Sequence, residues 1–230
     1  IHEEFSLNPL TKMVVGLRME RYDQFYTGVD QQEAAAPGTG INYQREPVLN
    51  NFNLFPTASL IYSVNENSNL RFGAFRTVAR PSFKEKSAAQ IEDVLTGITF
   101  IGNLDLTNTT ISNLDFRYEY FFEGGQTIGF SGFYKYFENP IELVAYSAAA
   151  PSNFQPRNVG NATVAGAEFE IRKNLGFIGM KHLELNSNFS YILSSVTRDS
   201  SEFAARVASA RKGEVISETR AMQGQSPYLI

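Results

Sequence analysis

The chain has 230 residues, no cysteine, no tryptophan and a formal net charge of −4. The absence of cysteine excludes a disulfide framework and a thiolate metal site, and the acidic balance argues against a nucleic-acid-binding domain, which usually carries a basic excess. Hydrophobic residues make up 43% of the chain and aromatic residues 13%, which favours a folded, β-rich protein over a disordered one.

The sequence predicts about eight strands, because apolar and polar residues alternate with a period of two in that many segments. In the fourth and fifth segments, an aromatic face alternates with a charged face on both sides of a turn at Gly124-Gly125. A long hairpin with one oily and one polar face is the repeating unit of a transmembrane β-barrel. The predicted strands are residues 13–26, 55–64, 69–79, 114–122, 128–136, 163–173, 183–196 and 228–230.

Short and long connections alternate along the chain. A soluble β-sandwich has no reason to sort its loops by length, whereas an outer-membrane barrel has short periplasmic turns and long extracellular loops. No apolar run is long enough for a transmembrane helix, so the predicted membrane segments are strands. The predicted short turns are residues 65–68, 123–126 and 174–180, and the predicted long loops are Thr27–Asn50, Arg80–Asn108, Glu138–Val159 and Thr197–Thr219.

Three features are predicted inside the long loops. Residues 82–95 have a helical spacing of apolar side chains and end at Gly97, a helix-stopping residue. Residues 147–156 are rich in alanine, proline and serine and are predicted to be irregular. A second short helix is predicted for residues 200–212, ending at Gly213.

The charged residues of the alternating strands are candidates for a polar wall that faces the barrel lumen. An acid–base or metal cluster is the alternative interpretation, but carboxylates without a cleft or a histidine are poor evidence for such chemistry. The two histidines, His2 and His182, lack the spacing of metal ligands. No catalytic residue, cofactor or metal is therefore predicted. The predicted lumen-facing residues are Arg18, Glu20, Asp115, Arg117, Glu119, Glu168, Glu170 and Arg172.

A small basic cluster lies in the last long loop, at Arg206, Arg211 and Lys212. We interpret it as the solvated face of a loop helix; contact with lipopolysaccharide or an anionic ligand is the alternative. Tyrosine and phenylalanine residues gather near the ends of the predicted strands, where they are typical of interfacial anchors.

A series of short motifs follows the same order as in a known family. The chain resembles the barrel of a TonB-dependent outer-membrane receptor of the type common in Bacteroidetes. At Leu104 it departs from the family, which usually has proline there. The matching motifs are VGLRME at 15–20, LFPTASL at 54–60, RTVARPSF at 76–83, GNLDL at 102–106, YEYF at 118–121, GFYK at 132–135, NPIE at 139–142, GAEFEIRK at 166–173 and QGQSPY at 223–228.

The resemblance implies an all-β, antiparallel transmembrane barrel. Such receptors resemble 22-stranded barrels with an N-terminal plug, so residues 1–230, with about eight predicted strands, are expected to be one partial barrel domain without the plug. The implied location is the bacterial outer membrane.

The resemblance also implies a non-enzymatic transport function. The extracellular loops would capture a small-molecule, oligosaccharide or peptide nutrient, and the TonB complex would drive its import through the missing plug region. Outer-membrane lipid and a surface lipoprotein are the other implied partners, and nucleic acid is not one. Two alternatives stay open: a structural or adhesion barrel that does not transport, and a soluble β-sandwich that binds a partner.

Overall fold

The computed structural model describes residues 2–147, 150–180 and 182–230. Its main body is a 10-stranded antiparallel sheet. The strands of this sheet are β1 (His2–Asn8), β2 (Thr11–Val29), β3 (Asn42–Asn65), β4 (Ser68–Ala79), β7 (Thr109–Phe121), β8 (Thr127–Glu138), β11 (Ala162–Asn174), β12 (Glu184–Thr197), β13 (Thr219–Arg220) and β14 (Tyr228–Leu229).

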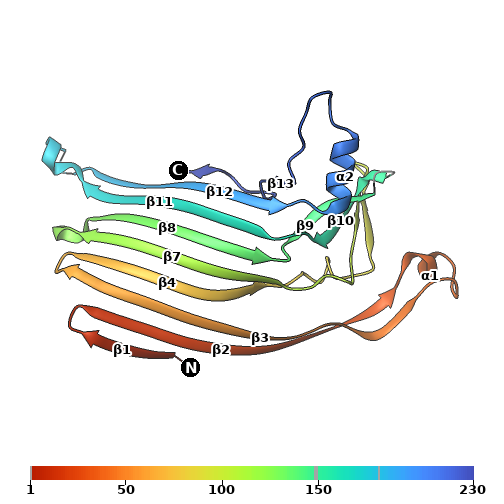
Figure 1. Cartoon of the computed structure of the whole chain (residues 1–230), viewed down its shortest axis with the longest axis horizontal. Coiled ribbons are helices and arrows are strands. Elements are labelled where there is room, and N and C mark those ends of the chain that lie inside the picture. The colour runs from red at the N-terminus through yellow and green to blue at the C-terminus, as the bar shows by residue number, and fades with distance from the viewer. Residues whose placement is uncertain (1, 148–149, 181) are drawn as a thin grey trace.

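The strands follow one another across the sheet in the order β1-β2-β3-β4-β7-β8-β11-β12-β13, and β14 pairs with β12 farther along. Figure 1 shows them side by side, from β1 in red to β12 in blue. The predicted antiparallel, all-β fold is confirmed. Strand β1 was not predicted from the sequence, although it pairs with β2 from His2 to Asn8.

The three predicted short turns lie at one end of the main sheet. The turn at 65–68 joins β3 to β4, the 3₁₀ turn η1 (Glu123–Gly125) joins β7 to β8, and the 3₁₀ turn η2 (Leu175–Ile178) lies between β11 and β12. The long connections, with helices α1 (Gln31–Ala35) and α2 (Ser200–Ala208), lie at the opposite end, on the right of Figure 1. The predicted sorting of loops by length is therefore confirmed.

One face of the main sheet is apolar and uncovered. Successive side chains of a strand point to opposite faces, and the strand register places Phe72, Phe116 and Gly132 in one row. Among the described residues no second layer packs on this face, so the structure lacks the buried interface that a soluble sandwich needs. Large exposed side chains on it include Phe72, Leu114, Phe130, Phe169, Phe189 and Leu193.

The predicted helix at 82–95 is wrong. Strands β5 (Gln90–Asp93) and β6 (Ile98–Ile101) form a hairpin there. Its turn is set by Asp93, whose carboxylate accepts hydrogen bonds from the Leu95 amide at 3.0 Å and the Thr96 hydroxyl at 2.8 Å. Gly97 has a φ of 67°, a left-handed conformation that suits glycine. Local turn chemistry thus prevails over a helical spacing of apolar residues.

The predicted irregular loop at 147–156 is also wrong where it can be described; residues 148 and 149 lie outside the described residues. Strands β9 (Ile141–Ser147) and β10 (Ala150–Asn158) pair as an antiparallel hairpin. β10 also pairs in parallel with β6, which completes a four-stranded sheet in the order β5-β6-β10-β9. Two long loops that are separate in sequence therefore share one small sheet, called here the loop sheet.

Two other predicted loops are partly ordered. In the stretch 27–50, β2 and β3 stay paired out to Val29 and Asn42, so this hairpin projects beyond the rest of the sheet in Figure 1. The second predicted helix is confirmed as α2, which ends at Ala208 rather than at residue 212. None of the helices in the described ranges is both long and apolar enough to span a bilayer.

A small hydrophobic core joins the loop sheet to the main sheet. Val144 of β9 packs with Val159, Ala162 and Val196, each at most 4% exposed. Ala162 pairs with Val196 across β11 and β12, on the same face of the sheet as Glu168 and Glu170. The loop sheet is therefore anchored over the charged face of the main sheet and not over its apolar face.

Candidate functional site

Arg117 is the centre of an ion network on the charged face. Its Nε donates to Glu119 Oε1 at 2.8 Å, its Nη1 to Ser131 Oγ at 3.0 Å, and its Nη2 to Glu170 Oε2 at 2.8 Å. These contacts join β7, β8 and β11, which are neighbours in the sheet. The predicted residues Arg117, Glu119 and Glu170 are thus brought together.

Arg71 completes the network and was missed by sequence reasoning. It lies directly opposite Arg117 in the β4–β7 register, a pairing of like charges that destabilises a sheet. Glu119 removes the conflict, because its Oε2 accepts a hydrogen bond from Arg71 Nε at 2.8 Å while its Oε1 binds Arg117. The alternation of residues 69–79 placed Arg71 on the polar face, but only the register of β4 and β7 shows its partner.

The network is a wall of ion pairs and not an acid–base site. Glu119 and Glu170 each accept a charge-assisted hydrogen bond from the Arg117 guanidinium, so both carboxylates are engaged in ion pairs across neighbouring strands. Within the described ranges there is also no group of three or more His, Cys, Asp or Glu side chains that could hold a metal ion.

Asp115 and Glu168 line a recess on the same face, with a volume of about 350 Å³, which Arg117 and Ser131 of the network also border. Phe133 and Lys135 line it as well. Neither carboxylate makes a hydrogen bond or an ion pair with any described residue. The recess is therefore a polar surface with free acceptors.

The remaining predicted residues lie toward the two ends of the sheet. Arg172 pairs with Glu184 at 2.7 Å near the short-turn end. Arg18 and Glu20 lie toward the loop end, where Arg18 Nη2 is 3.3 Å from Glu20 Oε2 and Arg80 Nη2 is 3.2 Å from the same oxygen. The predicted polar residues thus share one face but form separate groups along it.

A second ion network fastens the last long loop. Glu202 of α2 accepts hydrogen bonds from Arg198 at 2.5 Å and from Arg220 at 2.9 Å, and Arg220 also pairs with Glu142 of β9 at 2.6 Å. Burial opposes the ionisation of Glu202, but the hydrogen bonds and charges of Arg220 and Arg198 outweigh it and lower the pKa of this carboxyl. The network ties α2 and β13 to the loop sheet.

Lys86 is buried inside the loop 80–108, with 1% of its surface exposed. Its ammonium donates hydrogen bonds to the carbonyl oxygens of Leu104 at 2.6 Å and Leu106 at 2.5 Å. Burial lowers the pKa of Lys86, and the nearby charge of Asp105 opposes this shift. Lys86 therefore has a structural role, holding two ends of the loop together.

The predicted basic cluster lies on the outer surface of the last loop. Arg206 pairs loosely with Glu214 at 3.8 Å, and both side chains are exposed. Arg206, Arg211 and Glu214 border a shallow, polar depression. This arrangement agrees with a solvated helix face, and the opposite charge of Glu214 weakens any anion site there.

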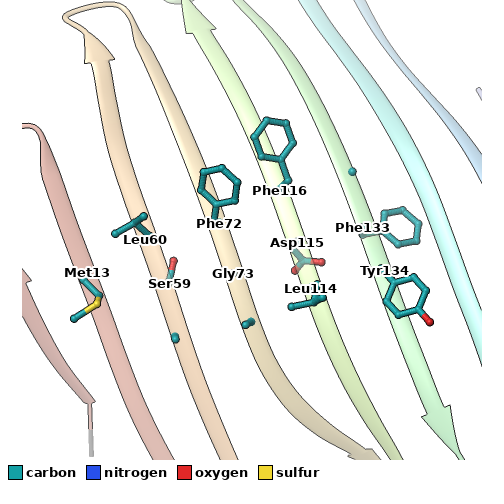
Figure 2. A pocket seen from close by; sticks show the side chains of 13 residues that line it. Met13, Ser59, Leu60, Phe72, Gly73, Leu114, Asp115, Phe116, Phe133 and Tyr134 are labelled. Carbon is teal, nitrogen blue, oxygen red and sulfur yellow. The ribbon is translucent and has the colours of Figure 1, made fainter.

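The apolar face has a wide depression of about 630 Å³. Its floor consists of small residues, Ala58, Ala74 and Gly132. No charged side chain belongs to this face of the depression, since the strand register places Asp115 with Phe133 on the opposite face. Aromatic and aliphatic side chains that border the depression, shown in Figure 2, include Met13, Leu60, Phe72, Leu114, Phe116 and Tyr134.

Comparison with solved structures supports the same architecture. The chain is similar to the copper transporter OprC, with 14% identity and a TM-score of 0.58, over 85% of this chain and 27% of that chain. It is similar to the siderophore receptor PirA from Pseudomonas aeruginosa, with 20% identity and a TM-score of 0.56, over 84% of this chain and 31% of that chain. PirA from Acinetobacter baumannii matches with 13% identity and a TM-score of 0.53, over 86% and 30% of the two chains.

The chain therefore spans less than a third of the length of these structures. At such low identities the likeness shows the fold alone, an antiparallel sheet that matches part of each of these larger chains. A comparison with curated proteins found no match.

The family assignment comes from a sequence model that covers almost the whole chain. The model, described as TonB dependent receptor-like, beta-barrel, matches residues 2–222. Members of this family are outer-membrane transporters and not enzymes, in agreement with the predicted location and the predicted absence of catalysis. The uncovered apolar face, the charged opposite face and the sorted loops agree with this match, and the chain belongs to the TonB-dependent receptor β-barrel family.

Proposed function

We propose that this chain is part of the wall of an active-transport receptor, which captures a nutrient with its extracellular loops and imports it with energy supplied by TonB. The observation that carries the proposal is the contrast between the two faces of one sheet. The apolar face is uncovered and has exposed aromatic side chains such as Phe72 and Phe130. The opposite face holds the network centred on Arg117.

In this proposal the charged face lines the lumen. Arg18, Glu20 and Asp115 lie on it with the Arg117 network, and Arg172 lies toward its short-turn end. A charged side chain at the lipid midplane costs about 2–4 kcal/mol, so these residues are stable only if the lipid contacts the other face. The short turns are then periplasmic, and the loop sheet and α2 are extracellular.

We further propose that residues 1–230 form one partial barrel domain of a larger receptor. A strand at the edge of a sheet exposes unpaired backbone groups, and β1 and β13 each pair with only one neighbour in the described sheet. Additional strands and a plug would close the barrel and provide the contact with TonB. The order of the motifs favours a Bacteroidetes-type member.

The ligand follows neither from the fold nor from the solved relatives, whose names mention siderophores and copper. A small molecule, an oligosaccharide or a peptide, with or without a surface lipoprotein partner, fits the proposed function equally well. Extracellular loops of a rigid scaffold are where binding residues concentrate. The loop sheet and α2 are thus the first surfaces to test.

The transport proposal is tested by comparing the medium of cells that express the full-length protein with that of cells that lack it. We expect one class of solute to be depleted only when the receptor is present, and this depletion to disappear in cells without TonB. Depletion that does not depend on TonB would contradict the proposal. An assembled barrel without any depletion would favour the structural or adhesion function.

A further inference from the structure

Strands β3 and β4 separate toward the loop end of the sheet. Their pairing ends at Thr57 and Phe75, whereas β3 stays paired with β2 and β4 stays paired with β7 up to Ala79 and Thr109. The two strands visibly diverge in Figure 1. A cleft of about 420 Å³ opens between them. This cleft, called here the fork cleft, has Arg18, Phe55, Thr57, Arg76, Thr77 and Arg80 among its bordering residues.

The fork cleft has an excess of positive charge. Arg18 and Arg80 share a single carboxylate oxygen, Glu20 Oε2, at 3.3 Å and 3.2 Å. No other acidic side chain is paired with either arginine among the described residues. Two guanidiniums beside one carboxylate leave a net charge of about +1, and Arg76, which borders the cleft from the opposite face of β4, adds a further positive charge. This excess favours a bound anion.

Both guanidiniums are held in place by aromatic rings. The Arg18 guanidinium lies 4.8 Å from the centre of the Phe55 ring, and the Arg80 guanidinium lies 4.6 Å from the centre of the Tyr22 ring. Such stacking orients the flat guanidinium while its N–H groups remain able to donate. The two donors are therefore arranged before any ligand arrives, which lowers the entropic cost of binding.

Arg80 has donors without acceptors. Its Nε and Nη2 atoms are buried, yet neither makes a hydrogen bond with any described residue; the contact with Glu20 is an ion pair only. A buried donor left unsatisfied costs about 1–3 kcal/mol, and more when it is charged. An oxyanion in the fork cleft would supply an acceptor to the accessible part of the Arg80 guanidinium.

We propose that the fork cleft binds the phosphate or carboxylate group of a small anionic solute, between Arg18 and Arg80. Guanidinium groups match the geometry of these oxyanions with paired N–H donors. The volume of the cleft lies within the range of small-ligand pockets. The inference rests on the proposed transport function, because the charged face must be open to the loop side for a solute to reach the cleft, and it names the ligand class as anionic.

Phenyl phosphate is a suitable probe, because it joins an oxyanion to one flat ring. Its binding to the full-length protein in detergent is measured by isothermal titration calorimetry, beside neutral benzyl alcohol. We expect saturable binding of phenyl phosphate and none of benzyl alcohol. The double substitution Arg18→Gln, Arg80→Gln should weaken binding at least about tenfold.

Arg21→Gln is the matched control, since Arg21 is on β2 but on the opposite face, where it pairs with Asp23 at 2.9 Å. It should leave the affinity within about twofold of the original. Glu20→Gln should strengthen binding severalfold, because it removes the carboxylate that competes with the ligand. A disturbed fold would not produce such a gain.

The site is refuted if phenyl phosphate fails to bind, if Arg21→Gln weakens binding as much as the double substitution, or if Glu20→Gln weakens it. The transport proposal is judged separately, by solute depletion. If phenyl phosphate binds but there is no TonB-dependent uptake, the anion site is supported and the transport proposal is contradicted. If there is TonB-dependent uptake but phenyl phosphate does not bind, only the anion site is contradicted.

Discussion

Gly166 shows how closely the charged face is packed at the residue scale. A Cβ atom at this position would lie 2.5 Å from Phe133 Cζ and 2.9 Å from the carbonyl oxygen of Tyr191. The ring of Phe133 covers the glycine from the neighbouring strand, as their register pairing requires. The glycine therefore leaves room for an aromatic ring on an otherwise polar wall.

We predict that Gly166→Ala lowers the free energy of unfolding by about 1–3 kcal/mol, the usual cost of overpacking. Gly73→Ala is the control, because its Cβ would meet nothing closer than 3.8 Å; it should leave stability unchanged or slightly raised. The measurement is urea unfolding of the full-length protein in detergent. Equal stability of the two variants would contradict the predicted contact of Phe133 with Gly166.

A second prediction concerns Lys86, whose ammonium joins two carbonyl groups of its loop. Lys86→Met leaves these carbonyls unsatisfied, at a local cost of about 1–3 kcal/mol. We expect faster proteolysis within residues 80–108, while the exposed Lys212→Met leaves the rate unchanged. An unaltered rate for Lys86→Met would show that the ammonium does not hold the loop.

Single residues also show which parts of the charged face could be predicted from the sequence. Arg117, Glu119 and Glu170 were assigned to one face from their alternation, because period-two patterns fix the face of each side chain. Arg71 was not singled out, and the Arg80 contact with Glu20 was not predicted. Such contacts depend on which strands are neighbours and on their register, and neither is encoded locally.

At the scale of elements, the long strands were predictable and the loop structure was not. The turn at 65–68 and helix α2 have local signals and appear where they were expected. The helix expected at 82–95 rested on apolar residues that do not face a core, since Val94 is 88% and Leu95 is 96% exposed. In the loop sheet, β10 pairs with β6 across a large sequence separation, which no local pattern reveals.

The local stability of helix α2 should be lower at acidic pH. Its Glu202 has a pKa below the usual value, so its ionised form stabilises the loop above the usual glutamate pKa of about 4.3. This contribution is lost as the pH falls through the lower, folded-state pKa. The acid-sensitive contact joins α2 to Arg220 and, through it, to Glu142.

We therefore expect the amide protection factors of α2, measured by hydrogen exchange, to fall when the pH is lowered from about 6 to about 3.5. Glu202→Gln should reduce protection at the higher pH and weaken its pH dependence, whereas the exposed Glu218→Gln should preserve both. A pH response that is the same in all three proteins would exclude Glu202 as its source.

At the scale of the whole molecule, the orientation of the sheet in the membrane is tested by two adjacent residues of β12. Phe189 pairs with Phe169 on the apolar face, and Asn188 pairs with Glu170 on the charged face. Phe189→Arg places a charge in lipid and should cost about 2–4 kcal/mol if it lies near the midplane. Asn188→Arg places its charge beside the Glu170 carboxylate and should change the folding free energy little.

The measurement is urea-dependent folding of the full-length protein into lipid vesicles. We expect a large loss of folding free energy for Phe189→Arg and a near-normal folding free energy for Asn188→Arg. The opposite order would place lipid against the charged face and would reverse the proposed orientation.

The length of the β2–β3 hairpin has a consequence for where this protein meets its surroundings. Strand β3 has 24 residues, which at a rise of about 3.3 Å per residue is a ribbon about 80 Å long. The apolar band of an outer-membrane barrel is only about 25 Å tall. Even if the strands are tilted, most of the hairpin therefore lies outside the bilayer, in water. Its tip is braced by Tyr26 against Tyr43, with ring centres 5.5 Å apart. In the proposed orientation, a molecule or particle that approaches the cell from outside would contact this hairpin before it reaches the rest of the barrel.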